Sequence, residues 1–146
     1  MLELARRRLQ RRELSLERIQ FIHADALAWV PQSRDFDLIV THFFLDCFRV
    51  DQLEPLVARL AAAAAPRANW LLADFRVAES GWRRRRSRLI LWTTYLFFRF
   101  ATKLPAHELT SPDSFLERCG FQLRERQVTD WGLLHSDWWQ RNGPAD

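Results

Sequence analysis

The chain has 146 residues, 48% of them hydrophobic and 13% aromatic, and a formal net charge of +4. This length and composition favour one folded domain with its own hydrophobic core and argue against disorder. No run reaches the roughly 18 apolar residues that a membrane span requires, and no apolar signal segment follows the first charged residues. We therefore expect a cytoplasmic protein without a membrane span.

Cysteine and histidine are too few and too scattered to form a dedicated metal site. Cys47 and Cys119 show neither a metal-binding spacing nor a disulfide framework, so we expect reduced, half-buried thiols. The histidines show no paired spacing, so no metal is expected. Positive charge comes almost wholly from arginine, clustered at 6–12 and 83–88. Such clusters are more often solvated helix faces than phosphate-binding surfaces, and nucleic acid is not the partner we expect.

The first part of the chain alternates between helical and strand patterns. Residues 1–12 predict a helix, and the β-branched and aromatic run 19–25 predicts a strand that ends in an acidic residue. A short helical turn follows at 26–29. The apolar run 36–43 is too short for an ordinary helix and predicts a strand buried on both faces. This central strand is the element around which the others are expected to pack.

The middle of the chain continues the alternation. Asp51 and Glu54 form a capping-box pattern, which predicts a helix that continues to Ala65 and is ended by Pro66. The apolar run 69–75 predicts another strand with a carboxylate near its end. The order of elements up to this point favours an α/β fold, in which ligands bind beyond the carboxyl ends of the strands.

The last third of the chain predicts helices and a hairpin. Residues 82–102 have a helical propensity, and the part at 89–98 is apolar on nearly every side, so we expect it to be buried or covered by a partner. Pro112, preceded by a serine as N-cap, predicts a helix start, and Gly120 a helix stop. Residues 121–139 contain two alternating segments, which predict an antiparallel pair with one of the two adjacent tryptophans buried and the other at a pocket rim.

Five short patterns, in this order and spacing, resemble the second part of the class I S-adenosylmethionine-dependent methyltransferase fold. They lie at residues 1–9, 21–26, 36–40, 66–75 and 115–121. The resemblance implies a Rossmann-like α/β methyltransferase sheet that is incomplete, with strands three to seven and a terminal antiparallel hairpin. It also implies a single partial domain over 1–146. The implied activity is methyl transfer from S-adenosylmethionine to an unidentified acceptor, which we expect to be a small molecule.

The resemblance implies cofactor contacts at two strand ends. Asp25 corresponds to the carboxylate that holds the adenine amino group, and Ala26 to the residue that lends a backbone amide. Asp25 could instead simply cap the turn that follows it. Thr41, His42 and Phe43 stand at the end of the central strand, where they either line the cofactor pocket or only finish the strand. His42 is a candidate general base, although a lone histidine is more often structural.

The expected substrate pocket contains four further residues. Asp46 is a candidate general base like His42, but a weaker one. Asp74 lies either at the pocket edge or in a turn where it faces Arg76. Trp82 and Tyr95 either form part of an aromatic substrate wall or belong to the core, and aromatic residues in such a helix are more often core.

Two features of the family are missing from this sequence, namely the glycine-rich loop after strand one and the acidic residue that closes strand two. Both would lie upstream of Met1, and the chain's glycines are Gly81, Gly120, Gly132 and Gly143. The loop matters because glycine lets the backbone approach the ligand closely. We therefore expect an N-terminally truncated or misassigned piece of a methyltransferase with exposed apolar sheet edges.

Two other classes of function remain open. The chain could be a non-catalytic methyltransferase-like remnant that acts as an interaction module and self-associates through the apolar helix at 89–100. It could also bind nucleic acid through residues 83–88, although it lacks the interleaved exposed aromatics of a single-strand binder. Cofactor binding distinguishes an enzyme from both alternatives.

Overall fold

The computed structural model describes residues 2–12, 17, 19–32, 35–76 and 110–143. Within these ranges the elements follow one another in the order α1 (Leu2–Arg11), β1 (Phe36–His42), η1 (Leu45–Cys47), α2 (Val50–Ala62), β2 (Ala64–Phe75), α4 (Asp113–Arg118), β3 (Phe121–Thr129), η2 (Asp130–Gly132) and β4 (Leu134–Arg141). No helix in the described part of the chain is long and apolar enough to cross a membrane.

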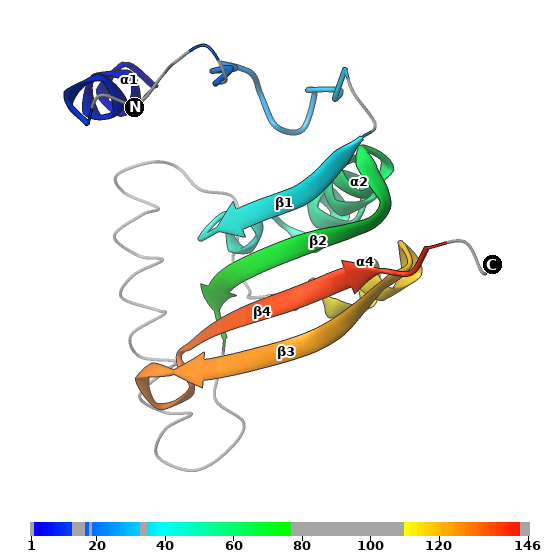
Figure 1. Ribbon diagram of the computed structural model, residues 1–146. Helices are drawn as coiled ribbons and strands as arrows, with labels where there is room; N and C mark the ends of the chain where they lie inside the picture. Colours follow the sequence, from blue (N-terminus) through cyan, green and yellow to red (C-terminus); the bar gives the residue numbers. More distant parts are fainter. Residues whose placement is uncertain (1, 13–16, 18, 33–34, 77–109, 144–146) are drawn as a thin grey trace.

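The four strands form one mixed sheet in the order β1-β2-β4-β3 (Figure 1). β1 and β2 run parallel, joined by helix α2, whereas β4 is antiparallel to both of its neighbours. The β3–β4 hairpin is therefore added to the parallel pair β1–β2 through antiparallel pairing of β4 with β2. This arrangement confirms the expected α/β class and the incomplete Rossmann-like sheet with a terminal antiparallel hairpin.

The hydrophobic core lies between one face of this sheet and the helices α2 and α4, which both lie behind the sheet in Figure 1. The apolar stripe of α2 faces inward because its leucines recur at helical spacing. Trp70 of β2 and Phe121 of β3 meet edge to face with centroids 5.5 Å apart. The fully buried large side chains of this core are Trp70, Trp139, Phe121, Leu45, Leu53, Leu56, Leu72, Leu116 and Val57.

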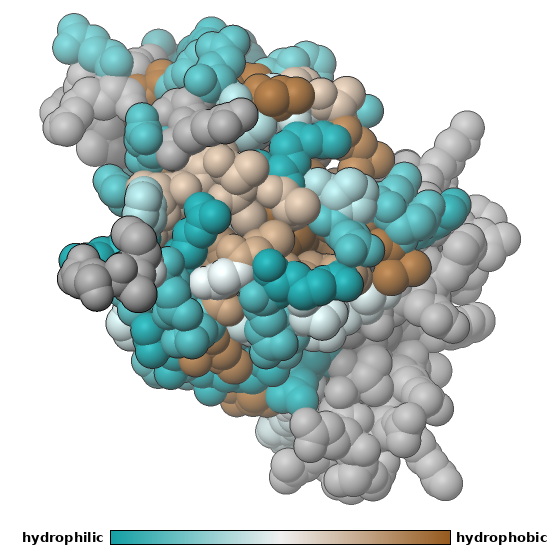
Figure 2. All heavy atoms as spheres, turned by 90° about the vertical axis from the view of Figure 1, so that its right-hand side faces the viewer, coloured by the Kyte–Doolittle hydropathy of each residue, from teal (hydrophilic) through white to brown (hydrophobic). Residues whose placement is uncertain are grey.

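The opposite face of the sheet is open. Val40, Leu71 and Trp138 project from it and are 61%, 42% and 40% exposed. Because side chains alternate along a strand, the neighbouring Trp139 points the other way and is buried. The prediction that one of these two tryptophans is buried is thus confirmed. On the face shown in Figure 2, by contrast, strongly hydrophobic residues form several small patches separated by hydrophilic ones.

The strand predicted at 19–25 does not form. These residues have no strand pairing, and the residues on either side of the following turn are mostly exposed. Strand geometry needs a neighbour, since its backbone donors and acceptors are otherwise unpaired. Among the described residues, none pairs with this segment as a neighbouring strand. The segment contacts α1 through the guanidinium of Arg6, which lies 5.3 Å from the ring centre of Phe21.

Helix α2 differs from the prediction at both ends. It begins at Val50, not after Asp51, because the Gln52 side chain accepts a hydrogen bond from the backbone N–H of Arg49 and the Asp51 carboxylate is bound by the Arg49 guanidinium. It ends at Ala62, before the alanine run is complete. Ala63 is the C-cap of the helix, and Ala64 and Ala65 already belong to β2, so helix propensity is overridden there by strand pairing.

Pro66, expected to end a helix, lies inside β2 at a bulge. Between two pairs of register partners, β1 advances by two residues, from Phe36 to Leu38, while β2 advances by five, from Ala64 to Asn69. The extra residues loop out of the ladder, which is where a residue without a backbone N–H is tolerated in a strand. From Asn69 onward the pairing of β2 is regular.

Candidate functional site

The chain turns sharply where β1 ends. Phe43 has a φ of 48°, a left-handed value that is unusual for a bulky residue. Two hydrogen bonds from this turn to β2 hold the conformation: the Phe43 N–H donates to the carbonyl of Ala73 at 2.8 Å, and the Phe44 N–H to Oδ1 of Asp74 at 3.1 Å. Strain of this kind persists only where surrounding bonds over-determine it and often marks a functional site.

This turn brings Asp46 and Asp74 to one pocket of about 280 Å³ beyond the carboxyl ends of β1 and β2. The remaining walls come from the residues after β2, the segment before α4, and the β3–β4 hairpin. The lining residues are Asp46, Asp74, Phe75, Arg76, Thr110, Ser111, Pro112, Asp113, Arg126 and His135. We call this the polar pocket. It contains both of the aspartates that the sequence analysis placed in a substrate pocket.

The carboxylates of the polar pocket are strongly influenced by burial. Removal from water raises the pKa of Asp74 to about 7, and the negative charge of Asp46 adds to this effect. Burial also raises the pKa of Asp46. The thiol of Cys47, beside Asp46, has its pKa raised to about 12 by burial and by that carboxylate, so it stays protonated and unreactive near neutral pH. Both cysteines are free and half-buried, as expected.

A buried charge cluster supports the pocket from the hairpin side. The Arg126 guanidinium donates to both carboxylate oxygens of Asp137 at 2.8 and 2.6 Å, and to both of Asp113 at 3.0 Å. Nδ1 of His135 lies 2.9 Å from Oδ2 of Asp137. Burial disfavours the charge on Asp137, but Arg126 and His135 outweigh it and lower its pKa to about 2.

This cluster was not anticipated from the sequence. His135 and Asp137 lie two residues apart on one face of β4, and Asp137 is the register partner of Arg126 on β3. An i, i+2 pair of polar residues on the same side as a buried tryptophan is a signal that could have indicated them.

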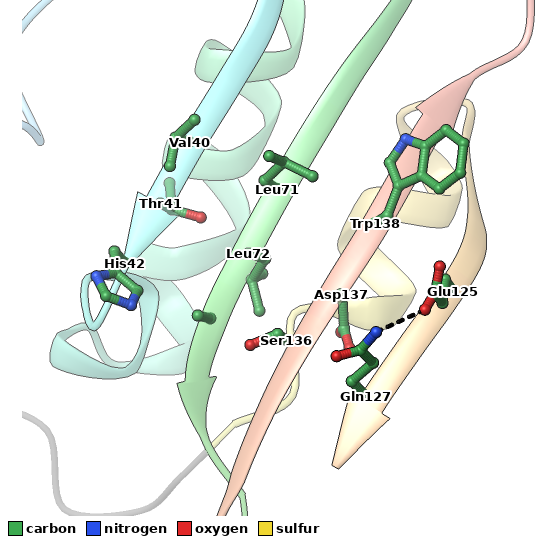
Figure 3. Close-up of a pocket in the computed structure, with 11 residues that line it drawn as sticks. Val40, Thr41, His42, Leu71, Leu72, Glu125, Gln127, Ser136, Asp137 and Trp138 are labelled. Atoms are coloured by element: carbon green, nitrogen blue, oxygen red, sulfur yellow. Dashed lines mark hydrogen bonds between the residues drawn. The ribbon is translucent and has the colours of Figure 1, made fainter. Parts of the chain in front are cut away.

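A second cavity, of about 330 Å³, is a shallow trough on the open face of the sheet (Figure 3). Its floor is apolar, formed by Val40, Leu71 and Trp138, and polar side chains surround it. Among them, the Gln127 amide donates to the Glu125 carboxylate at 2.8 Å. His42 lines the same trough at the end of β1, and its ring centre lies 4.8 Å from that of Phe43.

The predicted cofactor residues occupy two separate places. Asp25 organises the turn that follows it, with Oδ1 accepting from the Leu27 N–H at 2.9 Å, as the capping interpretation expects. The turn containing Ala26 docks on α2, where the Arg59 guanidinium donates to the carbonyl of Leu27. Neither of the two cavities is lined by Asp25 or Ala26. The residues at the end of β1 lie on the sheet instead.

The side chain of Thr41 is part of the core. Its Oγ1 accepts a hydrogen bond from Nε1 of Trp70 at 2.9 Å, and the residue is 5% exposed. His42 and Phe43 are exposed beside it. Asp74 lies near the end of β2 and lines the polar pocket together with Arg76, and its Oδ1 accepts a hydrogen bond from the Phe44 N–H. Trp82 and Tyr95 lie outside the described residues.

Comparison with known proteins identifies the fold. No family model matches the sequence, and no curated protein matches it. Solved structures do match: the mitomycin 7-O-methyltransferase MmcR has a TM-score of 0.70 and 19% identity, with 95% of this chain and 38% of that chain covered. The S-adenosylmethionine-dependent methyltransferase SibL, in its apo form, has a TM-score of 0.68 and 20% identity, with 97% and 40% covered.

A third match contains ligands. It is the Burkholderia thailandensis 1,6-didemethyltoxoflavin-N1-methyltransferase with bound 1,6-didemethyltoxoflavin and S-adenosylhomocysteine, which has a TM-score of 0.62 and 16% identity, with 94% of this chain and 56% of that chain covered. At these identities the likeness shows the fold alone. The chain has the fold of part of an S-adenosylmethionine-dependent methyltransferase, and it spans between 38% and 56% of the length of these three proteins.

Proposed function

We propose that this chain provides the acceptor-binding part of an S-adenosylmethionine-dependent methyl transfer to a small molecule. The observation that carries the proposal is the turn after β1, which places Asp46 and Asp74 in one pocket beyond the carboxyl ends of two parallel strands. In open α/β sheets this is where ligands bind. The fold shared with solved methyltransferases makes methyl transfer the reaction that best fits this position.

The residues of this chain fit part of a cofactor site. The Asp25 carboxylate is exposed and fixes its own turn, so it is free of the core and can accept from an adenine amino group. Ala26 follows it in that turn. His42 and Phe43 are exposed at the end of β1, whereas the Thr41 hydroxyl is buried and accepts a hydrogen bond from Trp70. When bound, S-adenosylmethionine supplies an electrophilic methyl group.

Methyl transfer needs little from the protein beyond positioning, and a base where the acceptor atom carries a proton. Two kinds of group in this chain can accept such a proton. His42 is the candidate from the trough side, and the aspartates of the polar pocket are the candidates from the other side. His42 is the proposed catalytic residue on the trough side, and Asp46 and Asp74 are proposed as substrate-binding residues that can also accept the proton of the acceptor atom.

A second candidate function is a non-catalytic interaction module. It is favoured by the open sheet face and by the outer edge of β1, where Leu38 and Val40 are more than half exposed. Exposed apolar strand edges pair readily with other chains. Self-association through residues 89–100 remains part of this proposal, and those residues lie outside the described part of the chain.

Calorimetric titration of the 146-residue chain with S-adenosylhomocysteine decides between the two. The methyltransferase proposal expects saturable binding that weakens at least tenfold in Asp25→Ala, with Asp51→Ala, an exposed carboxylate on α2, as the control. No binding at millimolar ligand by a chain whose circular dichroism shows a folded protein would contradict the proposal and support the interaction module. Equal loss in both variants would also contradict the role of Asp25.

A further inference from the structure

Asp74 has one oxygen that nothing in the described chain satisfies. Asp74 is only 3% exposed, and its Oδ1 accepts a hydrogen bond from the Phe44 N–H. Oδ2 is fully buried and has no hydrogen-bond partner. A buried acceptor without a partner is costly, and native structures retain such a group mainly where it has a function. Because Asp74 lines the polar pocket, a ligand can supply the missing donor.

The charges around the polar pocket favour a cation. Its lining contains the carboxylates of Asp46, Asp74 and Asp113 and two guanidiniums, of Arg76 and Arg126. Arg126 is already shared between Asp113 and the buried Asp137 behind the wall. Three carboxylates thus stand against two guanidiniums in the described lining, although the chain as a whole carries a net charge of +4. An anionic ligand at Asp74 would meet the carboxylates of Asp74 and Asp46.

We propose that the polar pocket binds an amine, whose protonated nitrogen donates to Oδ2 of Asp74 with the carboxylate of Asp46 beside it. The proposal rests on the proposed function, since it makes an amine the class of methyl acceptor. A hydroxyl group would satisfy Oδ2 but would leave both carboxylates uncompensated. An ammonium group brings several donors and a positive charge to the same point. Phe75 and Pro112 provide apolar wall for the carbon part of the ligand.

The same geometry provides for the proton. An amine nitrogen must lose its proton before it can accept a methyl group, and Oδ2 of Asp74 is the atom in contact that can take it. The proton then leaves the nitrogen for the carboxylate, and the nitrogen lone pair becomes available. With a pKa of about 7, Asp74 is well matched to this exchange near neutral pH.

This model predicts a pH dependence for binding. Below its pKa, Asp74 carries a proton that the ammonium group must displace, so affinity is expected to rise up to tenfold per pH unit until about pH 7 and then level off. The charged and titratable groups that face Asp74 from the surrounding elements are Asp46 of η1, Arg76 after β2, Asp113 of α4, Arg126 of β3, and His135 and Asp137 of β4.

Three probes of similar size and different charge test the proposal without any cofactor. Nuclear magnetic resonance titration of the 146-residue chain should show saturable shifts with benzylamine, at least tenfold weaker binding of benzyl alcohol, and none of benzoate. Asp74→Asn keeps an acceptor for the Phe44 N–H and should weaken benzylamine binding at least tenfold. Asp46→Asn, which leaves that hydrogen bond untouched, should weaken it several-fold, while Asp51→Asn should not change it.

Equal affinity for benzylamine and benzyl alcohol, or unchanged binding in a folded Asp74→Asn variant, would overturn the proposal. So would tighter binding of benzoate. These outcomes are independent of the titration with S-adenosylhomocysteine, because no cofactor is present. A chain that binds benzylamine but not S-adenosylhomocysteine contradicts the methyltransferase function and leaves the amine site standing. The reverse result contradicts only the amine site.

Discussion

The indole Nε1 of Trp70, at the centre of the core, donates a 2.9 Å hydrogen bond to Oγ1 of Thr41 on the neighbouring strand. Both residues are buried. Replacing Thr41 by valine keeps the shape but leaves the indole donor unsatisfied, which we expect to cost about 1–3 kcal/mol of unfolding free energy. Urea denaturation measures this loss. Thr41→Ser, which retains the hydroxyl, is the control, and an equal loss in both variants would show that packing matters more than the hydrogen bond.

Arg126 neutralises a carboxylate that has no access to water, since the Asp137 side chain is 0% exposed. Arg126→Gln leaves that carboxylate buried and without its cation, and we expect a loss of about 3 kcal/mol. Arg124, on the same strand, donates only to the Gln140 side chain at an exposed site. Arg124→Gln should therefore stay within about 0.5 kcal/mol of the original chain. Thermal or urea unfolding of the two variants at neutral pH makes the comparison, and similar losses would contradict a special role for Arg126.

The pKa of Asp74 links folding to pH. Because the folded-state pKa of about 7 exceeds the ordinary value of 3.8, the native state holds a proton that the unfolded chain has already released between these values. Stability should therefore fall as pH rises from about 4 to 7, by up to roughly 1.4 kcal/mol per unit, and then level off. Asp74→Asn should remove this slope. Unfolding free energies from pH 5 to 8 test it, a range in which Asp137, with a pKa of about 2, does not titrate. Parallel curves for the two proteins would refute it.

The two edges of the sheet should differ in their tendency to associate. β1 presents exposed apolar residues, including Val40, whereas β3 carries charged residues such as Arg124 and Glu125 next to a register shift. Charges and bulges protect strand edges from pairing with other chains. Val40→Lys should therefore reduce concentration-dependent association in sedimentation velocity runs, while Val128→Lys on β3 should have little effect. An equal response at both edges would mean that association does not use β1.

Much of the sheet could be predicted from the sequence because its strands are apolar or alternating runs bounded by turn-forming residues. The run that became β1 and the alternating segments that became β3 and β4 were recognisable from local pattern alone. The split between Trp138 and Trp139 followed from the alternation of side chains along a strand. Asp74 was expected at the end of a strand and Asp46 shortly after another, and both line the polar pocket.

Other features required the tertiary structure. The run at 19–25 has a strand's composition but no neighbour to pair with, and strand formation depends on that neighbour. The carboxylate of Asp137 is bound to Arg126 because strand register sets these two residues opposite each other. The hydroxyl of Thr41 is bound to Trp70, which lies on the neighbouring strand β2 as the register partner of Ile39. The local sequence thus indicated the runs that form the four strands of the described sheet and the polar residues at their ends. Register and burial decided which polar groups are used inside the protein and which, like Oδ2 of Asp74, are left for a ligand.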